Sequence, residues 1–411
     1  MKVLYNANVL VPPLSGVGIY TQRLGEAMSQ LSGVDSVQYF LNERCGDLDE
    51  LLALSEIEHK REPVVGQPPS IPWHKKILHA LLLRYSLREI KHIVCHYIPV
   101  LDRAWTVSRN WIEDLRRRRR VGSYVYHETN FVLEAHKGPK VVTVHDLSVI
   151  RYPQFHPEKR VKFMNEWMDK SIQRADQIIT VSEYIKREVI EHFGLEDSKV
   201  TAIAHAADEN YHPRKLEECS VVLKNYGLEY RGFLLVVGSM EPRKNLSLLM
   251  DAYTDLPSDL KQRYPIVHVG PPGWNNSEIV GKTAKLEELG WFRSLGYIDQ
   301  AELPVIFSAA AGLAFPSIYE GFGLPPLEAM ASGIPVLATN ASSIPEVVGN
   351  CGILVDPNSR KELTSGLEKL LGGGSEISEM IEAGLRRSSS YSWHRAAQET
   401  LDVYARAQNG Y

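Results

Sequence analysis

The sequence predicts an α/β protein built of two Rossmann-like, doubly wound domains that face each other across a cleft. Its 411 residues exceed what one ordinary hydrophobic core accommodates. Short β-branched and apolar runs alternate with helical patterns, which is typical of parallel βαβ units. A polar stretch at residues 211–214 separates two such series. We therefore expect one parallel sheet on either side of that stretch.

The first series predicts an N-terminal domain over residues 1–213. A helix is expected near residues 19–31, and a short helical pattern at residues 216–226 follows the polar stretch as part of the linker. Four apolar runs are expected to be strands, at residues 3–4, 141–144, 178–181 and 200–204.

The second series predicts a C-terminal domain over residues 214–390, which begins with the most clearly buried run of the chain at residues 233–237. Further strands are expected at residues 265–269, 313–315 and 336–338, with a helix at residues 245–253. Residues 391–411 are assigned to a closing helix, because apolar positions recur there at helical spacing. Ligands of doubly wound sheets bind at the carboxyl ends of the strands, so the loops after these runs are the candidate sites.

The composition excludes several classes of protein. A formal net charge of -4 argues against a nucleic-acid binder. The four cysteines form no CxxC pair, which favours a reducing cytoplasm over a disulfide framework. No apolar stretch approaches the roughly 20 residues of a membrane span, and the N-terminal segment lacks the cleavage region of a signal peptide. The lone Asp-x-Asp, at residues 47–49, lies in an acidic segment, so we expect no metal site.

Residues 105–120 carry two tryptophans followed by five consecutive arginines. The segment is either a solvated basic surface or an interfacial helix on an anionic membrane, where Trp lies at headgroup depth and Arg meets lipid phosphate. An arginine-rich RNA-binding segment is a third interpretation, but no RNA-reading motif accompanies it. The membrane interpretation predicts peripheral contact with the inner face of the membrane.

Residues 316–330 hold two carboxylates, Glu320 and Glu328, eight positions apart. The glycines Gly321 and Gly323 between them allow the backbone to approach a ligand closely. A helix that starts near Pro325 would direct its positive end at a phosphate, with Glu328 in its first turn. Glu320 could then accept hydrogen bonds from sugar hydroxyls and Glu328 from a ribose. Alternatively, Glu328 is only a helix-start carboxylate and the glycines form an ordinary turn.

A second candidate site follows the run at residues 233–237. It contains Ser239 and the adjacent cations Arg243 and Lys244, ahead of the next predicted helix. Cations at the carboxyl end of a buried strand are placed to neutralise a diphosphate, Arg bidentately and Lys as a point charge. Surface charges are the alternative interpretation, and the position after a buried strand weighs against it.

Two smaller features follow strands of the first half. Gly16 and Gly18 form a lone Gly-x-Gly, which supports a loop that approaches phosphate or acceptor but lacks the third glycine of a dinucleotide fingerprint. His145 and Asp146 end another predicted strand and are either polar groups of the core or a sugar-contacting pair. No Gly-x-Ser-x-Gly elbow supplies a nucleophile, so they do not belong to a hydrolase triad.

Taken together, these motifs resemble those of the retaining glycosyltransferases of family 4, which have the GT-B fold. The resemblance is carried by Glu320 and Glu328 around Gly-Phe-Gly, by the Gly-Ser-x-Glu-Pro-Arg-Lys-Asn of residues 238–245, and by the Ala-Ser-Gly-Ile-Pro-Val of residues 331–336. It is strongest over residues 234–356 and weakest over residues 47–125.

The resemblance implies roles for individual residues. Arg243 and Lys244 would hold the diphosphate of a nucleotide-sugar donor and stabilise it as it leaves, while Glu320 and His145 would contact the transferred sugar. The N-terminal domain would bind the acceptor, and the closing helix would cross back onto that domain. Donor binding would involve Gly16, Gly18, Ser239, Ile298, Gly321, Phe322, Gly323, Leu324 and Glu328.

Residues 126–131 and 145–157 are similar to the corresponding segments of bacterial mannosyltransferases of polysaccharide and O-antigen assembly. This implies GDP-mannose as donor, a lipid-linked or polysaccharide acceptor, no cofactor and no metal. UDP-glucose is the alternative donor. A nucleotide-sugar epimerase or hydrolase would need further acid/base residues beside His145, and a non-catalytic sugar-binding protein would tolerate loss of Arg243 or Glu320, both of which are present.

Overall fold

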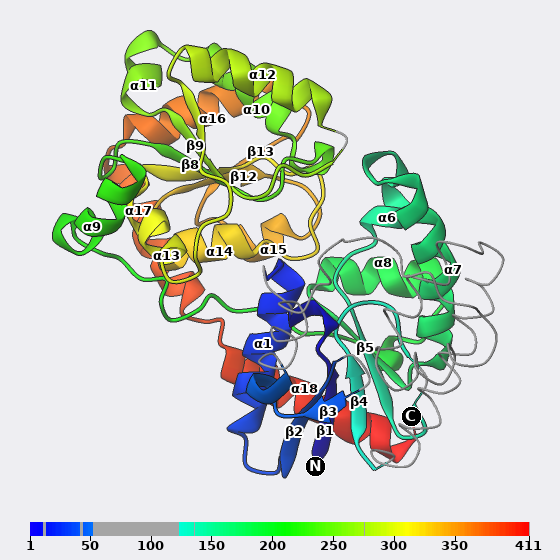
Figure 1. Cartoon of the computed structure of the whole chain (residues 1–411). Helices are drawn as coiled ribbons and strands as arrows, with labels where there is room; N and C mark the ends of the chain where they lie inside the picture. Colours follow the sequence, from blue (N-terminus) through cyan, green and yellow to red (C-terminus); the bar gives the residue numbers. More distant parts are fainter. Residues whose placement is uncertain (11–13, 42–43, 52–122, 135, 275, 411) are drawn as a thin grey trace, which may run out of the picture.

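The computed structural model describes residues 1–10, 14–41, 44–51, 123–134, 136–274 and 276–410. Two α/β lobes lie side by side, each with a sheet between layers of helices (Figure 1). This confirms the predicted fold class. No helix among the described residues is long and apolar enough to cross a membrane. The basic segment at residues 105–120 lies outside the described residues.

The N-terminal lobe contains a seven-stranded sheet, within the described residues, in the order β3-β2-β1-β4-β5-β6-β7. All neighbouring pairs are parallel except β2 with β3. The strands are β1 Lys2–Asn6, β2 Ser36–Leu41, β3 Arg44–Gly46, β4 Val125–Glu128, β5 Lys140–Val144, β6 Gln177–Thr180 and β7 Val200–Ala202. The helices of this lobe are η1 Asn8–Leu10, α1 Gly16–Ser29, α6 Ser148–Arg151, η2 Pro153–Phe155, α7 Glu158–Arg174, α8 Glu183–Phe193 and η3 Asp197–Lys199.

The C-terminal lobe contains a six-stranded parallel sheet in the order β10-β9-β8-β11-β12-β13, again counted in the part of the chain that the structure describes. Its strands are β8 Leu234–Val237, β9 Ile266–Val269, β10 Phe292–Ser294, β11 Gly312–Phe315, β12 Val336–Thr339 and β13 Ile353–Val355. Its helices are α9 Leu216–Tyr226, η4 Pro242–Lys244, α10 Leu246–Thr254, α11 Ser258–Arg263, α12 Ser277–Glu288, α13 Leu303–Ala309, α14 Leu324–Ala331, α15 Ile344–Val348, α16 Arg360–Gly372 and α17 Ser375–Ser388.

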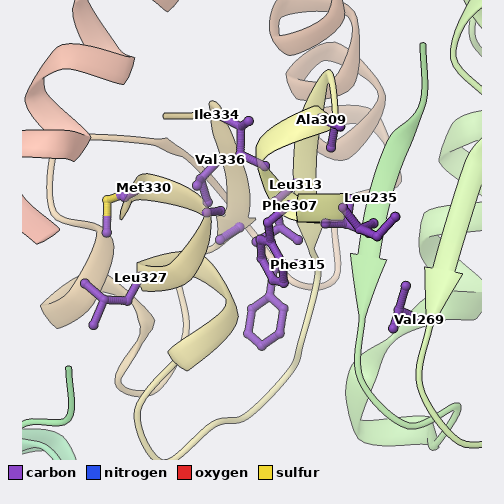
Figure 2. Packing of buried hydrophobic residues seen from close by; sticks show 14 of the residues in the cluster. Leu235, Val269, Phe307, Ala309, Leu313, Phe315, Leu327, Met330, Ile334 and Val336 are labelled. Atoms are coloured by element: carbon purple, nitrogen blue, oxygen red, sulfur yellow. The ribbon is translucent and has the colours of Figure 1, made fainter. Parts of the chain in front are cut away.

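The core of the C-terminal lobe fixes the strands that precede the candidate site. Figure 2 shows Leu235, Phe315 and Val336, which come from β8, β11 and β12, in one cluster of buried side chains with Leu327 of α14 and Phe307 of α13. All five side chains are buried. Because the neighbouring strands β8 and β11 are central to this core, the loops that leave their carboxyl ends start from rigid positions.

Strand β4 was not expected from an apolar run, and its residues explain why. All four positions are buried, yet two of them are His127 and Glu128. Each is satisfied by hydrogen bonds, His127 with Tyr404 and Thr143 at 2.7 Å, and Glu128 as acceptor from Asn6 at 2.8 Å. Polar partners from distant elements thus replace the hydrophobic pattern that a buried parallel strand usually shows.

The closing helix α18 Trp393–Asn409 packs on the N-terminal lobe, which confirms the predicted crossing (Figure 1). Its buried side chains include Tyr404, whose hydroxyl donates to the Tyr5 hydroxyl at 3.0 Å. Ser392 caps the helix by accepting a hydrogen bond from the backbone of Arg395. The chain therefore ends on the lobe in which it begins.

Candidate functional site

The candidate site lies where the strand order of the C-terminal sheet reverses, between β8 and β11. A ligand-binding crevice is expected at such a switch point. The loop after β8 turns through Gly238, which has a φ of 138°, and ends in η4, after which Asn245 adopts a φ of 58°. Ser239 lies in this loop. The turn places Arg243 and Lys244 beside the loop after β11.

The two cations meet a single carboxylate. Arg243 Nη1 donates to Glu320 Oε2 at 2.8 Å, and Lys244 Nζ donates to Glu320 Oε1 at 2.6 Å. Arg243 also donates to the carbonyl of Tyr319 at 2.7 Å and to Glu241 Oε1 at 2.9 Å. The structure therefore brings together three of the residues that the sequence assigned to catalysis, from two loops more than seventy residues apart.

The charge state of this cluster follows from its surroundings. Burial by itself would raise the pKa of Glu320, but the nearby charges of Arg243 and Lys244 outweigh that effect and lower the pKa to about 2. Burial opposes the charge of Arg243, yet Glu320 and Asp146 raise its pKa above the usual value. The carboxylate and the guanidinium are thus fully ionised at neutral pH, and they hold each other in place.

The glycine-rich loop after β11 packs closely against the N-terminal lobe. A Cβ atom built on Gly321 would lie 1.9 Å from the carbonyl oxygen of His145, so only glycine fits there. The Gly321 carbonyl accepts a hydrogen bond from Ser182 Oγ at 2.7 Å. Phe322 is buried, and its ring lies 5.0 Å from that of His205. This loop therefore forms part of the contact between the two lobes.

Helix α14 begins at Leu324 after Gly323, which has a φ of 118°. Two prolines follow Leu324 and carry no N–H, and Leu327 donates its N–H to the carbonyl of Gly323. Leu324 therefore supplies an N–H that this helix start can offer a phosphate, whereas Pro325 and Pro326 supply none. Glu328 is the fifth residue of the helix, so its predicted place in the first turn is wrong.

Glu328 is buried on the inner side of α14. Burial raises its pKa to about 7, and Asp208 adds to this, although a hydrogen bond from the Tyr211 hydroxyl acts in the opposite direction. Asp208 in turn pairs with Arg23 of α1 at 2.5 Å. The carboxyl group therefore lies where the linker, α1 and α14 meet, and it changes its charge near neutral pH.

His145 follows β5 and lies on the N-terminal side of the site. Its Nε2 is 2.8 Å from the carbonyl oxygen of Thr129, an arrangement in which the ring donates. Burial lowers the pKa of His145. Its ring is packed edge-on against Tyr20 of α1, with 5.0 Å between the ring centroids. His145 is therefore oriented by the backbone and by an aromatic neighbour.

The two glycines of α1 differ in their surroundings. Gly16 is the first residue of the helix, and a Cβ built on it would meet none of the described residues within 4 Å, which leaves room for a ligand. A Cβ on Gly18 would lie 2.5 Å from the carbonyl oxygen of Val9. Ser15 caps the helix by accepting from Gly18 N at 3.3 Å. Gly18 is thus needed for packing, whereas no described residue packs against Gly16 in this way.

The predicted base-binding residue Ile298 is 3% exposed and belongs to the core of the C-terminal lobe. Its side chain is occupied by packing, so any contact with a base would come from its backbone. The preceding Tyr297 is exposed. The role of this segment stays a prediction.

Sequence reasoning missed Tyr319, the residue just before Glu320. It is 1% exposed and packs in the hydrophobic cluster of the N-terminal lobe, although it belongs to the C-terminal chain segment. Its hydroxyl donates to Glu188 and accepts from the backbone N–H of Leu147 at 3.1 Å. Nothing in the local sequence distinguishes this tyrosine from a residue of its own domain core.

A second contact between the lobes was also missed. Trp274 Nε1 donates to the carbonyl of Phe155 at 2.8 Å, and the guanidinium of Arg160 lies 5.5 Å from the Trp274 ring.

Within the described residues, no group of three or more His, Cys, Asp or Glu side chains is placed to hold a metal ion.

Comparison with known proteins identifies the family of the chain. Residues 14–211 match the family described as Glycosyltransferase Family 4, and residues 225–387 match Glycosyl transferases group 1. O-antigen chain mannosyltransferase B of Escherichia coli is 30% identical over 404 residues, which cover 98% of this chain and 99% of the relative. The serotype-specific mannosyltransferase WbdA of Escherichia coli is 31% identical over 260 residues, 61% of this chain and 31% of the relative.

Solved structures share the fold. Sucrose-phosphate synthase from Thermosynechococcus elongatus has a TM-score of 0.64 at 18% identity, with 98% of both chains covered. Anabaena Alr3699/HepE in complex with UDP and glucose has a TM-score of 0.65 at 16% identity, with 98% of this chain and 99% of that chain covered. Two facing Rossmann-like domains with a cation–carboxylate site at the switch point thus define a glycosyltransferase with the GT-B fold. The chain belongs to glycosyltransferase family 4.

Proposed function

We propose that this enzyme transfers mannose from GDP-mannose to a lipid-linked or polysaccharide acceptor of O-antigen assembly, with retention of the anomeric configuration. The names of its Escherichia coli relatives support the sugar and the type of acceptor. The observation that carries the proposal is the largely buried pairing of Arg243 and Lys244 with Glu320 at the contact between the lobes.

The pairing provides a preassembled site for a leaving diphosphate. Arg243 and Lys244 would repel each other without an anion between them, and Glu320 holds them together before any donor arrives. Lys244 donates one of its three N–H bonds to Glu320, so two remain for phosphate oxygens. Donors that are already oriented lower the barrier because they need no reorganisation as charge develops.

The sugar would lie between the two lobes, near Glu320, the Gly321–Gly323 backbone and His145. Glu328 would bind the ribose, and Gly16 would allow the diphosphate to approach the start of α1. In this arrangement the departing phosphate accepts the proton of the incoming hydroxyl on the same face of the sugar, which accounts for retention without a protein nucleophile. Closure of the lobes excludes water from the reaction.

The test is to incubate the protein with GDP-mannose or UDP-glucose, each with and without a glycan acceptor. We expect consumption of GDP-mannose only when acceptor is present, and a product with the α configuration by NMR. Consumption of UDP-glucose alone would overturn the proposed donor. Donor breakdown without acceptor would indicate a hydrolase, and an inverted product would contradict retention.

We further propose that the reaction needs no divalent metal, because Arg243 and Lys244 provide the positive charge at the diphosphate. Addition of EDTA should leave most of the transfer activity intact. Complete loss of activity that magnesium restores would contradict this part of the proposal.

A further inference from the structure

A second histidine on the N-terminal side of the cleft has no role in the scheme above. His156 lies between η2 and α7 and is 5% exposed. Neither Nδ1 nor Nε2 has a hydrogen-bond partner among the described residues. The imidazole is therefore buried with its whole hydrogen-bonding capacity unused.

Such a group destabilises the folded state. A buried polar atom without a partner costs about 1–3 kcal/mol, and native proteins contain few of them. The hydrogen-bonding capacity of such a group can be used by a water molecule, an ion or a ligand that the protein alone does not provide. The position of His156 shows what kind of partner can reach it.

Trp274 is a residue of the C-terminal lobe that contacts His156, and charged groups of the candidate site influence the imidazole. Burial lowers its pKa, Arg160 and Arg243 lower it further, and Asp146 and Glu241 act in the opposite direction. Among the described residues, Glu241 Oε2 is also buried without a partner. Trp274 of the C-terminal lobe lies next to the histidine, with 6.2 Å between ring centroids.

His205 provides an internal comparison, because both of its ring nitrogens are also buried without a partner among the described residues. Its neighbours are aromatic rings: Tyr20 at 4.8 Å, Phe322 at 5.0 Å and Trp393 at 5.7 Å between centroids. His205 thus acts as a flat ring in an aromatic stack. His156, by contrast, has Trp274 as its aromatic neighbour, and charged groups of the candidate site influence its pKa.

The neutral imidazole has one N–H donor and one acceptor nitrogen, and a sugar hydroxyl both donates and accepts. Glu241 Oε2 offers a second acceptor nearby. We propose that His156 binds a hydroxyl group of a sugar held in the cleft and acts as a specificity-determining residue for that sugar. The inference rests on the proposed glycosyltransfer, and the sugar is either that of the donor or that of the acceptor.

The experiment compares the wild-type chain with H156F, H156Q and the matched control H192Q. Phenylalanine keeps a flat ring and removes both nitrogens, while glutamine retains one donor and one acceptor. His192 is exposed on α8 and lies outside the site. Calorimetric titration of GDP and of the intact nucleotide sugar, together with the KM for acceptor, separates the two sources of the hydroxyl.

We expect H156F to weaken one of these steps about ten-fold, the equivalent of one neutral hydrogen bond. Weaker binding of the nucleotide sugar with unchanged GDP binding assigns the hydroxyl to the donor. A raised KM for acceptor with unchanged donor binding assigns it to the acceptor. H156Q should recover part of the loss, and H192Q should behave as wild type.

A structural role predicts a different pattern. Because the nitrogens of His156 have no partner among the described residues, H156F should keep or raise the melting temperature while transfer falls. A fall in melting temperature with proportionate loss of all activities would overturn the inference, as would wild-type affinities for both sugars. The proposed function is tested separately, by which donor the wild-type protein consumes. The affinity of H156F relative to wild type is then measured with that donor. If the wild-type protein consumes neither donor, both the proposed function and this inference are overturned.

Discussion

The two sides of the candidate site are built in different ways. On the C-terminal side, Arg243, Lys244 and Glu320 are charged, largely shielded from solvent and paired with one another. On the N-terminal side, His145 and His156 lie in surroundings that favour the uncharged ring, and His156 makes no hydrogen bond within the described protein. One side therefore holds paired charges in position before a ligand arrives, whereas the other presents uncharged rings.

This difference suggests that the two sides have different roles in the reaction. Preorganised charges are effective where negative charge develops, at the bond that breaks to the diphosphate. Neutral imidazoles suit hydroxyl groups, which need a donor and an acceptor but no net charge. The C-terminal side should therefore determine the rate of the chemical step, and the N-terminal side should determine which sugar is accepted.

Replacement of Glu320 by Gln should reduce kcat about 100- to 1,000-fold, because Arg243 and Lys244 lose the anion that orients them. Removing one partner of a buried ion pair should also lower the free energy of unfolding by about 3–5 kcal/mol. Steady-state kinetics and denaturant unfolding measure the two effects. The control is Glu278→Gln, an exposed carboxylate of the same lobe. Turnover near that of wild type would remove Glu320 from the site.

Gly321→Ala should reduce kcat/KM about 100-fold, since the new Cβ would collide with the backbone of His145 and displace one side of the cleft from the other. The control is Gly281→Ala on α12, where a Cβ meets nothing within 4 Å. That change should leave activity intact and stabilise the helix by about 0.5–1 kcal/mol. Equal activities of the two variants would show that the contact between the lobes does not matter for catalysis.

Glu328 should make donor binding depend on pH. With a pKa of about 7, its carboxyl group is protonated below neutrality, and the protonated form accepts a ribose diol less well. Affinity for the nucleotide sugar should therefore rise as the pH increases from 6 to 8, and Glu328→Gln should abolish the dependence. Titration calorimetry at several pH values checks this, and an unchanged slope in the variant would exclude Glu328.

The same shift has a consequence of opposite sign for stability. The pKa of Glu328 is higher in the folded than in the unfolded chain, so the folded state binds the proton more tightly. This contribution to stability is complete below the unfolded pKa and is lost as the pH rises through about 7. Acidic buffer should thus increase the contribution of Glu328 to folding stability while it weakens donor binding.

Tyr319→Phe should have the smallest effect. The ring would stay in the N-terminal cluster, but the hydrogen bonds to Glu188 and from Leu147 would be lost. We expect a loss of about 1–2 kcal/mol in unfolding free energy and a modest fall in kcat. Denaturant unfolding measures the first. A loss of activity as large as that of Glu320→Gln would show that the contact between the lobes, and not the charge cluster, limits the reaction.

Much of the fold could be predicted because its information is local. The buried runs that became β5, β6, β8, β9, β11 and β12 are recognisable from a few consecutive apolar residues. Strand β4 could not be recognised in this way, because His127 and Glu128 are buried through partners that lie elsewhere in the chain. A pattern of apolar residues cannot represent a strand whose burial depends on distant hydrogen bonds.

The candidate site, too, could be predicted only in part from the sequence. The sequence alone indicated which loops form the candidate site, since Arg243 and Lys244 are adjacent and Glu320 is followed by Gly321 and Gly323. The pairing of both cations with Glu320, across 77 positions for Arg243 and 76 for Lys244, became visible only in the folded chain. The same holds for the contact of Trp274 with His156, with 6.2 Å between ring centroids. Short spacing fixes neighbours along one loop, whereas contacts between loops depend on where the packed sheets place their ends.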